Sequence, residues 1–197
     1  VARRLAHEIR NPLTPIQLSA ERLRRRFSSQ ITTDRETFER CTDTITRQVA
    51  DIGRMVEEFS GFARMPKPTF GSFNIVDMVQ SVAFAQRMAT PAINVPVNAP
   101  NSPIAMLGDE RMLAQALTNV VKNAAEAVER QIETGGVKVG SVTIDVHEDG
   151  DEVQVTVRDN GPGFPVEDRD RLLEPYVTSR KNGVGLGLAI VTRIVED

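Results

Sequence analysis

The chain has 197 residues, of which 40% are hydrophobic and 26% charged, and its net charge is −3, values that predict a soluble globular protein of one large or two small domains. No apolar run approaches the length of a membrane span, and the single cysteine, Cys41, excludes an internal disulfide and argues against a cysteine-based metal site. The chain begins with Val, so we expect it to be a piece of a longer protein. The single cysteine fits a reducing compartment, and we expect a cytoplasmic location.

Charge is spread unevenly, since residues 1–65 are mildly basic and residues 66–197 are acidic. The densest basic run comprises Arg22, Arg24, Arg25 and Arg26. Such a run can mark a nucleic-acid contact, but few aromatic residues and no base-reading motif accompany this one. We interpret the run as a solvated helix face and expect no nucleic-acid partner.

Two amphipathic helices are predicted at the start of the chain. Apolar residues recur every three or four positions over residues 1–28, at Leu5, Ile9, Leu13, Ile16, Ala20, Leu23 and Phe27. After a polar break, a second series combines a seven-residue repeat with intervening valines, at Phe38, Ile45, Val49, Ile52, Val56 and Phe59. A hairpin of two such helices cannot bury both stripes alone, so we expect a dimer that completes a four-helix bundle. A purely structural coiled coil is the alternative.

The pattern changes after residue 64. Prolines and a glycine end the second helix and predict a linker over residues 65–72. Beyond it we expect helices over residues 75–88, 109–133 and 185–196, short strands over 92–97 and 104–107, and a β-hairpin around Asp149-Gly150. This mixture predicts an α+β domain.

His7 is one of only two histidines and lies at about 200° around the helix from Leu5 and Ile9, so it faces away from the apolar stripe. An exposed neutral imidazole is a good nucleophile near neutral pH. Glu8 can orient the ring or accept its proton during attack. The sequence therefore predicts a nucleophilic histidine.

Three downstream elements favour a polyphosphate site. Asn119 and Asn123 project from the same face of a helix, and amide oxygens suit Mg²⁺ that bridges phosphates. Glycines follow Asp159 at the end of a predicted strand and surround the start of the last helix, at Gly161, Gly163, Gly183, Gly185 and Gly187. Glycines at a helix N-terminus let backbone N–H groups approach phosphate oxygens.

These stretches, in this order, resemble the motifs of two-component sensor histidine kinases. The sequence HEIRNPLTPI from His7 resembles the H-box, NVVKNAAEA from Asn119 the N-box, DNGPGF from Asp159 the first glycine box and GVGLGLAIV from Gly183 the second. LLEPYVTSR stands where the family has its F-box, with Leu173 in place of the usual aromatic residue. The residues of the H-box and of the stretch EPYVTSRKNGVGLGLAIV are similar to those of the nitrogen-regulation sensor kinases of the NtrY type.

The resemblance implies an α+β fold in three parts. Residues 1–64 would form the dimerisation and histidine-phosphotransfer hairpin, an antiparallel pair that builds a dimeric four-helix bundle, and residues 65–72 the linker. Residues 73–197 would form a Bergerat-type α/β sandwich, the catalytic ATP-binding domain, shortened at its C-terminal end.

The same resemblance assigns roles to individual residues. His7 matches the phosphoacceptor, Glu8 the acidic neighbour that assists phosphotransfer, and Asn11 the residue that orients water for dephosphorylation of the partner. Asn123 matches the Mg²⁺ ligand, with Asn119 one turn before it. Asp159 would accept a hydrogen bond from the adenine amino group, with Gly161 and Gly163 beside the base. The phosphates would be contacted by either Arg180 or Lys181 in the lid and by the loop residues Gly183, Gly185, Leu186 and Gly187.

The function implied is a homodimeric kinase that uses ATP and Mg²⁺ to phosphorylate His7 and passes the phosphoryl group to an Asp of a response regulator receiver domain. We expect the cytoplasmic part of a sensor that reaches the membrane only through upstream segments. One alternative is a clamp-type ATPase, but Asn119 stands where those enzymes need a general base, and an amide cannot deprotonate water. A second is a catalytically silent dimeric scaffold.

Overall fold

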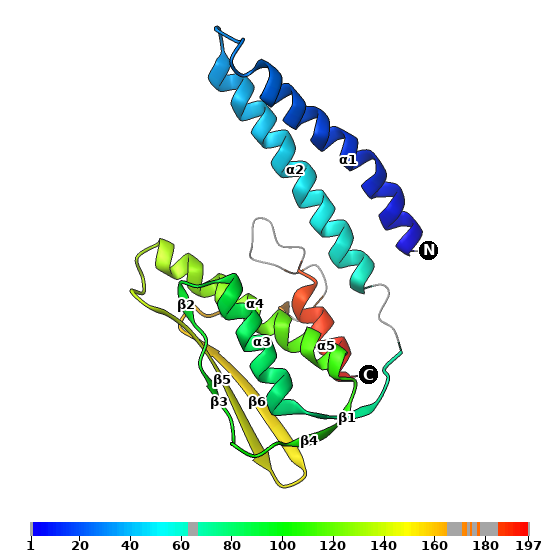
Figure 1. The fold of residues 1–197 in the computed structure, drawn as a ribbon, viewed down its shortest axis with the longest axis vertical. Helices are drawn as coiled ribbons and strands as arrows, with labels where there is room; N and C mark the ends of the chain where they lie inside the picture. The colour runs from blue at the N-terminus through cyan, green and yellow to red at the C-terminus, as the bar shows by residue number, and fades with distance from the viewer. Residues whose placement is uncertain are drawn as a thin grey trace. The chain divides into compact units, whose positions relative to one another are not determined.

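The computed structural model describes residues 2–62, 67–164, 171, 172, 174, 177 and 185–196. The chain divides into two compact units, one formed mainly by residues before 67 and the other mainly by residues after it. The first is a helical hairpin and the second combines helices with strands (Figure 1), so the predicted α+β class is confirmed.

The hairpin consists of α1 (Ala2–Phe27) and α2 (Arg35–Phe62). α1 continues through both Pro12 and Pro15, although a proline in a helix interior cannot donate its hydrogen bond. The buried apolar residues of the pair are small, namely Ala6, Ala20, Val49 and Val56. Nine large apolar residues among those described in the hairpin are exposed, namely Ile9, Ile16, Leu18, Leu23, Phe27, Ile45, Ile52, Met55 and Phe59. One face of the hairpin is therefore closed by small side chains, while a row of large apolar side chains stays open.

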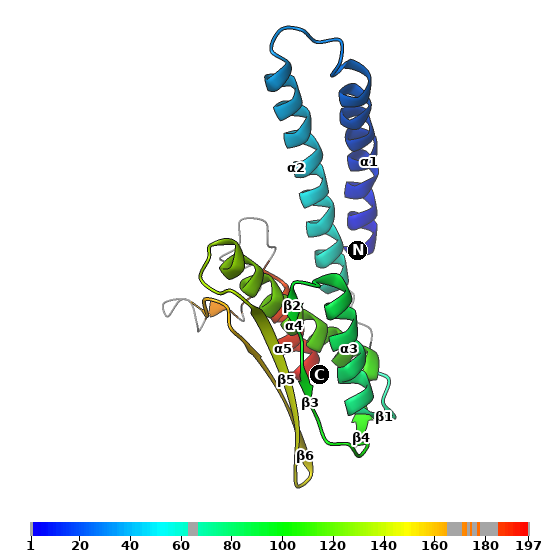
Figure 2. The ribbon, with the colours of Figure 1, turned by 60° about the vertical axis from the view of Figure 1, so that its left-hand side comes forward.

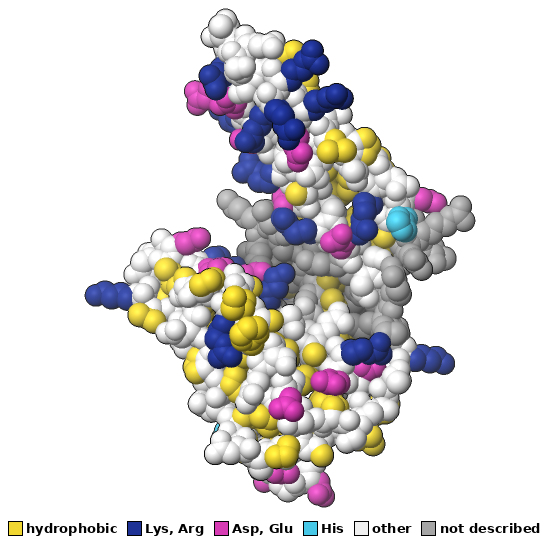
Figure 3. Space-filling model, in the orientation of Figure 1, with side chains coloured by type: hydrophobic (Ala, Val, Ile, Leu, Met, Phe, Trp, Pro, Cys, Tyr) yellow, Lys and Arg dark blue, Asp and Glu magenta, His cyan; other side chains and the backbone are white. Residues whose placement is uncertain are grey.

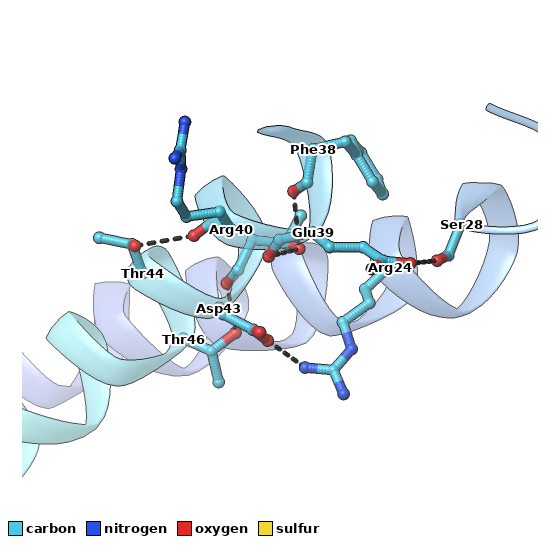
Figure 4. A network of polar contacts seen from close by, with 9 residues as sticks. Arg24, Ser28, Phe38, Glu39, Arg40, Asp43, Thr44 and Thr46 are labelled. Carbon is cyan, nitrogen blue, oxygen red and sulfur yellow. Dashed lines mark hydrogen bonds and ion pairs between the residues drawn. The ribbon is translucent and has the colours of Figure 1, made fainter. Parts of the chain in front are cut away.

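Polar contacts join the two helices near the turn between them (Figure 4). Ser28 Oγ donates to Glu39 Oε1 at 2.6 Å, and Arg24 forms an ion pair with Asp43. Within α2, Arg35 Nε donates to the same oxygen of Glu39 at 2.9 Å. The hydrogen bond from Ser28, followed by that from Arg35, holds the pKa of the Glu39 carboxyl below its ordinary value. Figure 3 shows Lys and Arg side chains gathered at this end of the hairpin, as expected for a solvated basic face.

The second unit begins with a strand that the sequence does not predict. β1 (Gly71–Asn74) pairs antiparallel with β4 (Ala105–Gly108), so the last two residues of the predicted linker already belong to a strand. The side chain of Asn74 then caps α3 (Ile75–Ala89) by accepting the N–H of Val76 at 3.2 Å. It also accepts the N–H of Ile104 at 3.1 Å, and this second bond ties the start of α3 to the segment before β4.

The main sheet is built around β5 (Gly140–Asp149), which pairs antiparallel with β6 (Glu152–Asp159). The predicted strand over residues 92–97 is two short strands, β2 (Ile93–Asn94) and β3 (Val97–Asn98), both parallel to β5. Pro96 lies between them and has no N–H, although its carbonyl accepts the N–H of Ile144 at 3.0 Å. The β5–β6 turn is Gly150 and Asp151, one residue later than predicted, with Gly150 at φ +62°.

Helices α3 and α4 (Glu110–Glu133) cover one face of this sheet, and α5 (Gly187–Glu196) packs against α4 (Figures 1 and 2). The core between the layers contains Val142, Ile144 and Val146 of β5, Val79 of α3, and Val121 and Val128 of α4. α5 begins two residues later than predicted. Among the described helices, none combines the length and apolar character needed to cross a membrane.

Candidate functional site

The predicted phosphoacceptor His7 lies on α1 with its side chain exposed, while the neighbouring Ala6 is buried. Glu8 and Asn11 are exposed as well, and Asn11 follows His7 by one helical turn. Arg10 Nη2 donates to Glu57 Oε1 of α2 at 2.9 Å, which ties the two helices together one turn from His7. The imidazole is therefore open to a reaction partner and stands on a helix that is held locally.

Asp109 positions the start of α4, the helix that carries the predicted N-box. Its buried carboxylate caps the helix by accepting the N–H groups of Arg111 at 3.1 Å and Met112 at 3.2 Å, and it accepts the N–H of Thr69 at 2.8 Å. The hydrogen bond from Thr69, followed by that from the Arg111 side chain, lowers the pKa of Asp109 to about 2. The carboxylate thus joins the segment that enters this unit to the N-box helix.

Asn119 and Asn123 both project from α4, and Asn119 has an unusual environment. Its amide nitrogen is buried and finds no hydrogen-bond partner among the residues that the structure describes. Buried polar groups in proteins are nearly always paired, so an exception of this kind calls for an explanation. An amide donor held ready for the oxygen of a ligand explains it, and a phosphate oxygen fits this chemistry.

The first turn of α5 lies beside Asn123. A Cβ added to Gly187 would sit 3.5 Å from Asn123 Nδ2 and 3.8 Å from Oδ1, so the glycine keeps the space next to the amide open. Gly185, just before the helix, has φ +71°, a conformation that favours glycine. Leu186 between them is fully buried. The second glycine motif and the N-box therefore meet at the start of α5.

The first glycine motif meets α4 one turn further along. The N–H of Gly161 donates to Asp159 Oδ1 at 2.9 Å, and a Cβ on Gly161 would lie 3.1 Å from Cβ of Ala127 and 3.2 Å from its carbonyl carbon. The same Cβ would lie 2.8 Å from Asp159 Oδ1, so a side chain at this position would force Asp159 or α4 to shift. Ala127 is a residue that the sequence analysis missed, although the regular spacing 119, 123, 127 along one helix face is a signal that points to it.

The structure thus brings five of the eleven predicted nucleotide contacts to one helix. Asn119, Asn123, Asp159, Gly161 and Gly187 lie along α4 or against it, and Gly163 follows in the same loop with φ +74°. Arg180, Lys181, Gly183 and Leu173 lie outside the described residues. No three His, Cys, Asp or Glu side chains within the described ranges gather as a metal site. A bound Mg²⁺ would accordingly depend on the amide oxygen of Asn123 together with phosphate oxygens, a donor set of the hard type it prefers.

Two protein-family models match parts of the chain. Residues 1–68 match the model of the His Kinase A (phospho-acceptor) domain. Residues 108–197 match the model of the histidine kinase-, DNA gyrase B- and HSP90-like ATPase. The chain thus combines a phospho-acceptor domain with an ATPase domain of the histidine kinase type, and by these two matches it belongs to the sensor histidine kinase family.

Within the family, the chain is similar to kinases of the NtrY type, which confirms the predicted resemblance. It is 51% identical to the nitrogen regulation protein NtrY of Azorhizobium caulinodans, over all of this chain and 25% of that protein. It is 40% identical to the putative sensor histidine kinase NtrY-like of Rickettsia conorii, over all of this chain and 32% of that protein. The chain therefore spans about a quarter to a third of the length of these relatives.

Solved structures of histidine kinases share the fold. Full-length ShkA in complex with AMPPNP superposes with a TM-score of 0.68 at 26% identity, over 99% of this chain and 40% of that one. The catalytic domain of the histidine kinase ThkA superposes with a TM-score of 0.55 at 27% identity, over 66% of this chain and 81% of that one.

Proposed function

We propose that the chain is the catalytic core of a sensor kinase that transfers the γ-phosphoryl group of ATP to His7 and then to an Asp of a response regulator receiver domain. The hairpin up to residue 64 acts as the dimerisation and phosphotransfer domain, and the unit that follows the linker binds ATP. The core works as a homodimer on the cytoplasmic side of a membrane-anchored sensor.

The observation that carries this proposal is the convergence of separate motifs on α4. Asn123 lies beside Gly187, and Ala127 lies beside Gly161 with Asp159 next to it, so three segments distant in sequence form one surface. Asn119 adds a buried amide donor without a partner among the described residues. On this surface Asp159 would accept a hydrogen bond from the adenine amino group, and the glycines around Gly185 would approach the phosphates. Asn123 would hold Mg²⁺, which would neutralise phosphate charge when bound.

His7 performs the chemical step. Its unprotonated ring nitrogen attacks the γ-phosphorus, a P–N bond forms as the bond to the leaving oxygen of ADP breaks, and Glu8 accepts the proton released by the ring. The phosphoryl group then moves to the receiver carboxylate and the imidazole is regenerated. Positioning and charge neutralisation supply most of the catalysis in such transfers, so few other groups are needed.

Phosphorylation assays on variants of the two histidines distinguish this proposal from its alternatives. The chain is incubated with γ-labelled ATP, and we expect an acid-labile, base-stable label that is lost in His7→Ala. The matched control is His147→Ala, because His147 is the other histidine of the chain and lies exposed on β5. Label that persists in His7→Ala would contradict the proposal, and rapid steady-state ATP turnover without label would favour a clamp-type ATPase.

Partner binding is proposed from the same domain arrangement. The histidine kinase ThkA, which shares the fold with a TM-score of 0.63, has been solved in complex with the response regulator protein TrrA. The exposed row of large apolar side chains on the hairpin supports a dimer, because a second hairpin would cover it and complete a four-helix bundle.

Dephosphorylation of the partner is a further part of the proposal, carried by the exposed amide of Asn11 one turn after His7. A relative at 31% identity, of which this chain covers 55%, is the sensory histidine kinase/phosphatase NtrB of Rhodobacter capsulatus. We expect Asn11→Ala to slow loss of phosphate from the phosphorylated regulator, while Gln48→Ala, an exposed amide on α2, leaves the rate unchanged. Equal rates in both variants would remove Asn11 from this role.

A further inference from the structure

The side chain of Asn160 takes part in the last hydrogen-bonded pair between β5 and the end of β6. In an antiparallel pair, two opposite residues exchange two backbone N–H···O bonds. The N–H of Asn160 donates to the carbonyl of Ser141 at 3.2 Å, but the N–H of Ser141 donates to Asn160 Oδ1, at 2.9 Å. The side-chain oxygen therefore takes the position in the ladder that the backbone carbonyl of residue 160 would otherwise fill, and the chain can turn away from the sheet directly after Asp159.

The second group of the same amide extends this contact by one residue. Asn160 Nδ2 donates to the carbonyl of Val139 at 2.9 Å. Three hydrogen bonds thus join Asn160 to the segment that enters β5. Ser141 is paired on its other side with Asn94 of β2, so the amide is fastened to a strand that is held from both sides.

The residues on both sides of Asn160 belong to the nucleotide surface. Asp159 precedes it as the last residue of β6, and Gly161 follows it in contact with Ala127 of α4. We infer that Asn160 is a positioning residue of the nucleotide site, which holds the end of β6 so that Asp159 meets the adenine amino group. This inference rests on the proposed function, because it assumes that Asp159 accepts a hydrogen bond from the adenine amino group.

The contact requires both halves of a short amide. An aspartate at position 160 keeps an acceptor for Ser141 but cannot donate to the carbonyl of Val139, and it places a second carboxylate beside Asp159. An alanine removes both bonds.

Nucleotide selectivity tests the inference in the 197-residue chain. Dissociation constants for ATP and for inosine triphosphate, whose base carries an oxygen in place of the adenine amino group, are measured by calorimetry. We expect Asn160→Ala to weaken ATP binding by about tenfold, the effect of a misplaced hydrogen-bond partner, and to weaken inosine triphosphate binding much less. The ratio of the dissociation constant for inosine triphosphate to that for ATP therefore falls toward one in this variant. The exposed loop residue Asn101 gives the control variant, Asn101→Ala, with constants like those of the unaltered chain.

The outcomes distinguish a failure of the proposed function from a failure of the inference about Asn160. An unaltered chain that binds neither nucleotide contradicts the proposed function. If the unaltered chain prefers ATP and Asn160→Ala keeps that preference, Asn160 does not position Asp159. A parallel loss of affinity for both nucleotides also overturns the inference, because it shows a general structural effect. Asn160→Asp, which keeps the bond from Ser141, provides the same comparison if the alanine variant does not fold.

Discussion

At the scale of single residues, Asn119 and Asn123 share one face of α4 but have different surroundings. The amide nitrogen of Asn119 is buried without a partner among the described residues, and Asn123 has the open glycine position of residue 187 beside it. Leaving a buried polar group unpaired costs about 1–3 kcal/mol of stability. Such costs are typical of binding sites, where the missing partner is supplied by the ligand.

Replacement of Asn119 by leucine tests this reading. We expect Asn119→Leu to raise the free energy of unfolding without nucleotide by about 1 kcal/mol, because the buried donor is removed, and to weaken ADP binding. Urea denaturation and calorimetry measure the two effects. The exposed Gln115 of the same helix supplies the control, since Gln115→Leu should change stability by no more than about 0.5 kcal/mol. A destabilised Asn119→Leu would show that the amide is needed by the fold itself.

The acid stability of the chain should depend on Asp109. Its carboxyl has a pKa of about 2 in the folded chain against an ordinary 3.8, so the ionised form stabilises the fold at neutral pH. This contribution is complete above the ordinary pKa and is lost as the pH falls from about 4 to about 2. We expect Asp109→Asn to be less stable than the unaltered chain at pH 7, with a difference that shrinks over that interval. Urea denaturation at several pH values measures it, and a difference independent of pH would contradict this role.

At the scale of elements, β5 begins at a glycine because α4 is close. A Cβ on Gly140 would lie 2.6 Å from Val128 Cγ1 and 2.9 Å from Ile132 Cδ1, both on α4. The absent side chain thus lets the strand start under the helix and opposite Ile93 of β2. A side chain at position 140 would have to displace Val128 and Ile132, so the glycine allows α4 and β5 to pack this closely.

The same substitution should therefore have opposite effects in two elements. Gly140→Ala is expected to lower the free energy of unfolding by about 1–3 kcal/mol, because the added methyl overpacks the layer between α4 and the sheet. Gly53 in α2 has no atom within 4 Å of an added Cβ, so Gly53→Ala should raise it by about 0.5–1 kcal/mol through helix propensity. Thermal and urea denaturation measure both. An unaffected Gly140→Ala would mean that α4 and β5 can separate at little cost.

Most elements follow from local patterns, and the exceptions have local causes. The segment 92–97 is recognisable as a strand, and the positions on both sides of Pro96 pair with β5 in one register, Ile93 with Gly140 and Val97 with Ile144. The proline interrupts the pairing because it lacks an N–H. β1 is too short for a period of two to be visible, and its pairing with β4 depends on residues more than 30 positions away.

At the scale of the whole molecule, the hairpin separates small and large apolar residues onto different faces. Val49 and Val56 of α2 are buried, whereas Ile45 and Ile52 are 42% and 40% exposed. Large aliphatic side chains contribute more on burial than small ones, so a second hairpin that covers them gains free energy. This arrangement favours the proposed dimer.

A charge in the exposed apolar row should prevent dimerisation. We expect Ile52→Glu to change the mass in solution from that of a dimer to that of the 21.7 kDa monomer, measured by size exclusion with light scattering. The control is Arg47→Glu, an exposed position on α2 that alters the charge by twice as much but lies outside the apolar row. A dimer that survives Ile52→Glu would place the interface elsewhere.

Much of the candidate site follows from the sequence, because its residues stand in motifs whose spacing is local. Asn119 and Asn123 share a face by helix geometry, and glycines mark the ends of β6 and the start of α5. The contacts of Ala127 and Asn160 were missed because each depends on a partner from another element, Gly161 in one case and Ser141 in the other. A contact between two distant segments leaves no periodic pattern in the sequence from which it could be predicted.

The helices, the order of the motifs and the exposure of His7 can be predicted from the sequence, since they depend on propensity, periodicity and residue chemistry within one segment. Three features become visible only in the folded chain. Two glycine motifs meet one face of α4, the side chain of Asn160 ends the pairing of β6 with β5, and small residues close the hairpin while large ones stay exposed. The reason is physical: these features are contacts between segments far apart along the chain, and they exist only once packing has brought the segments together.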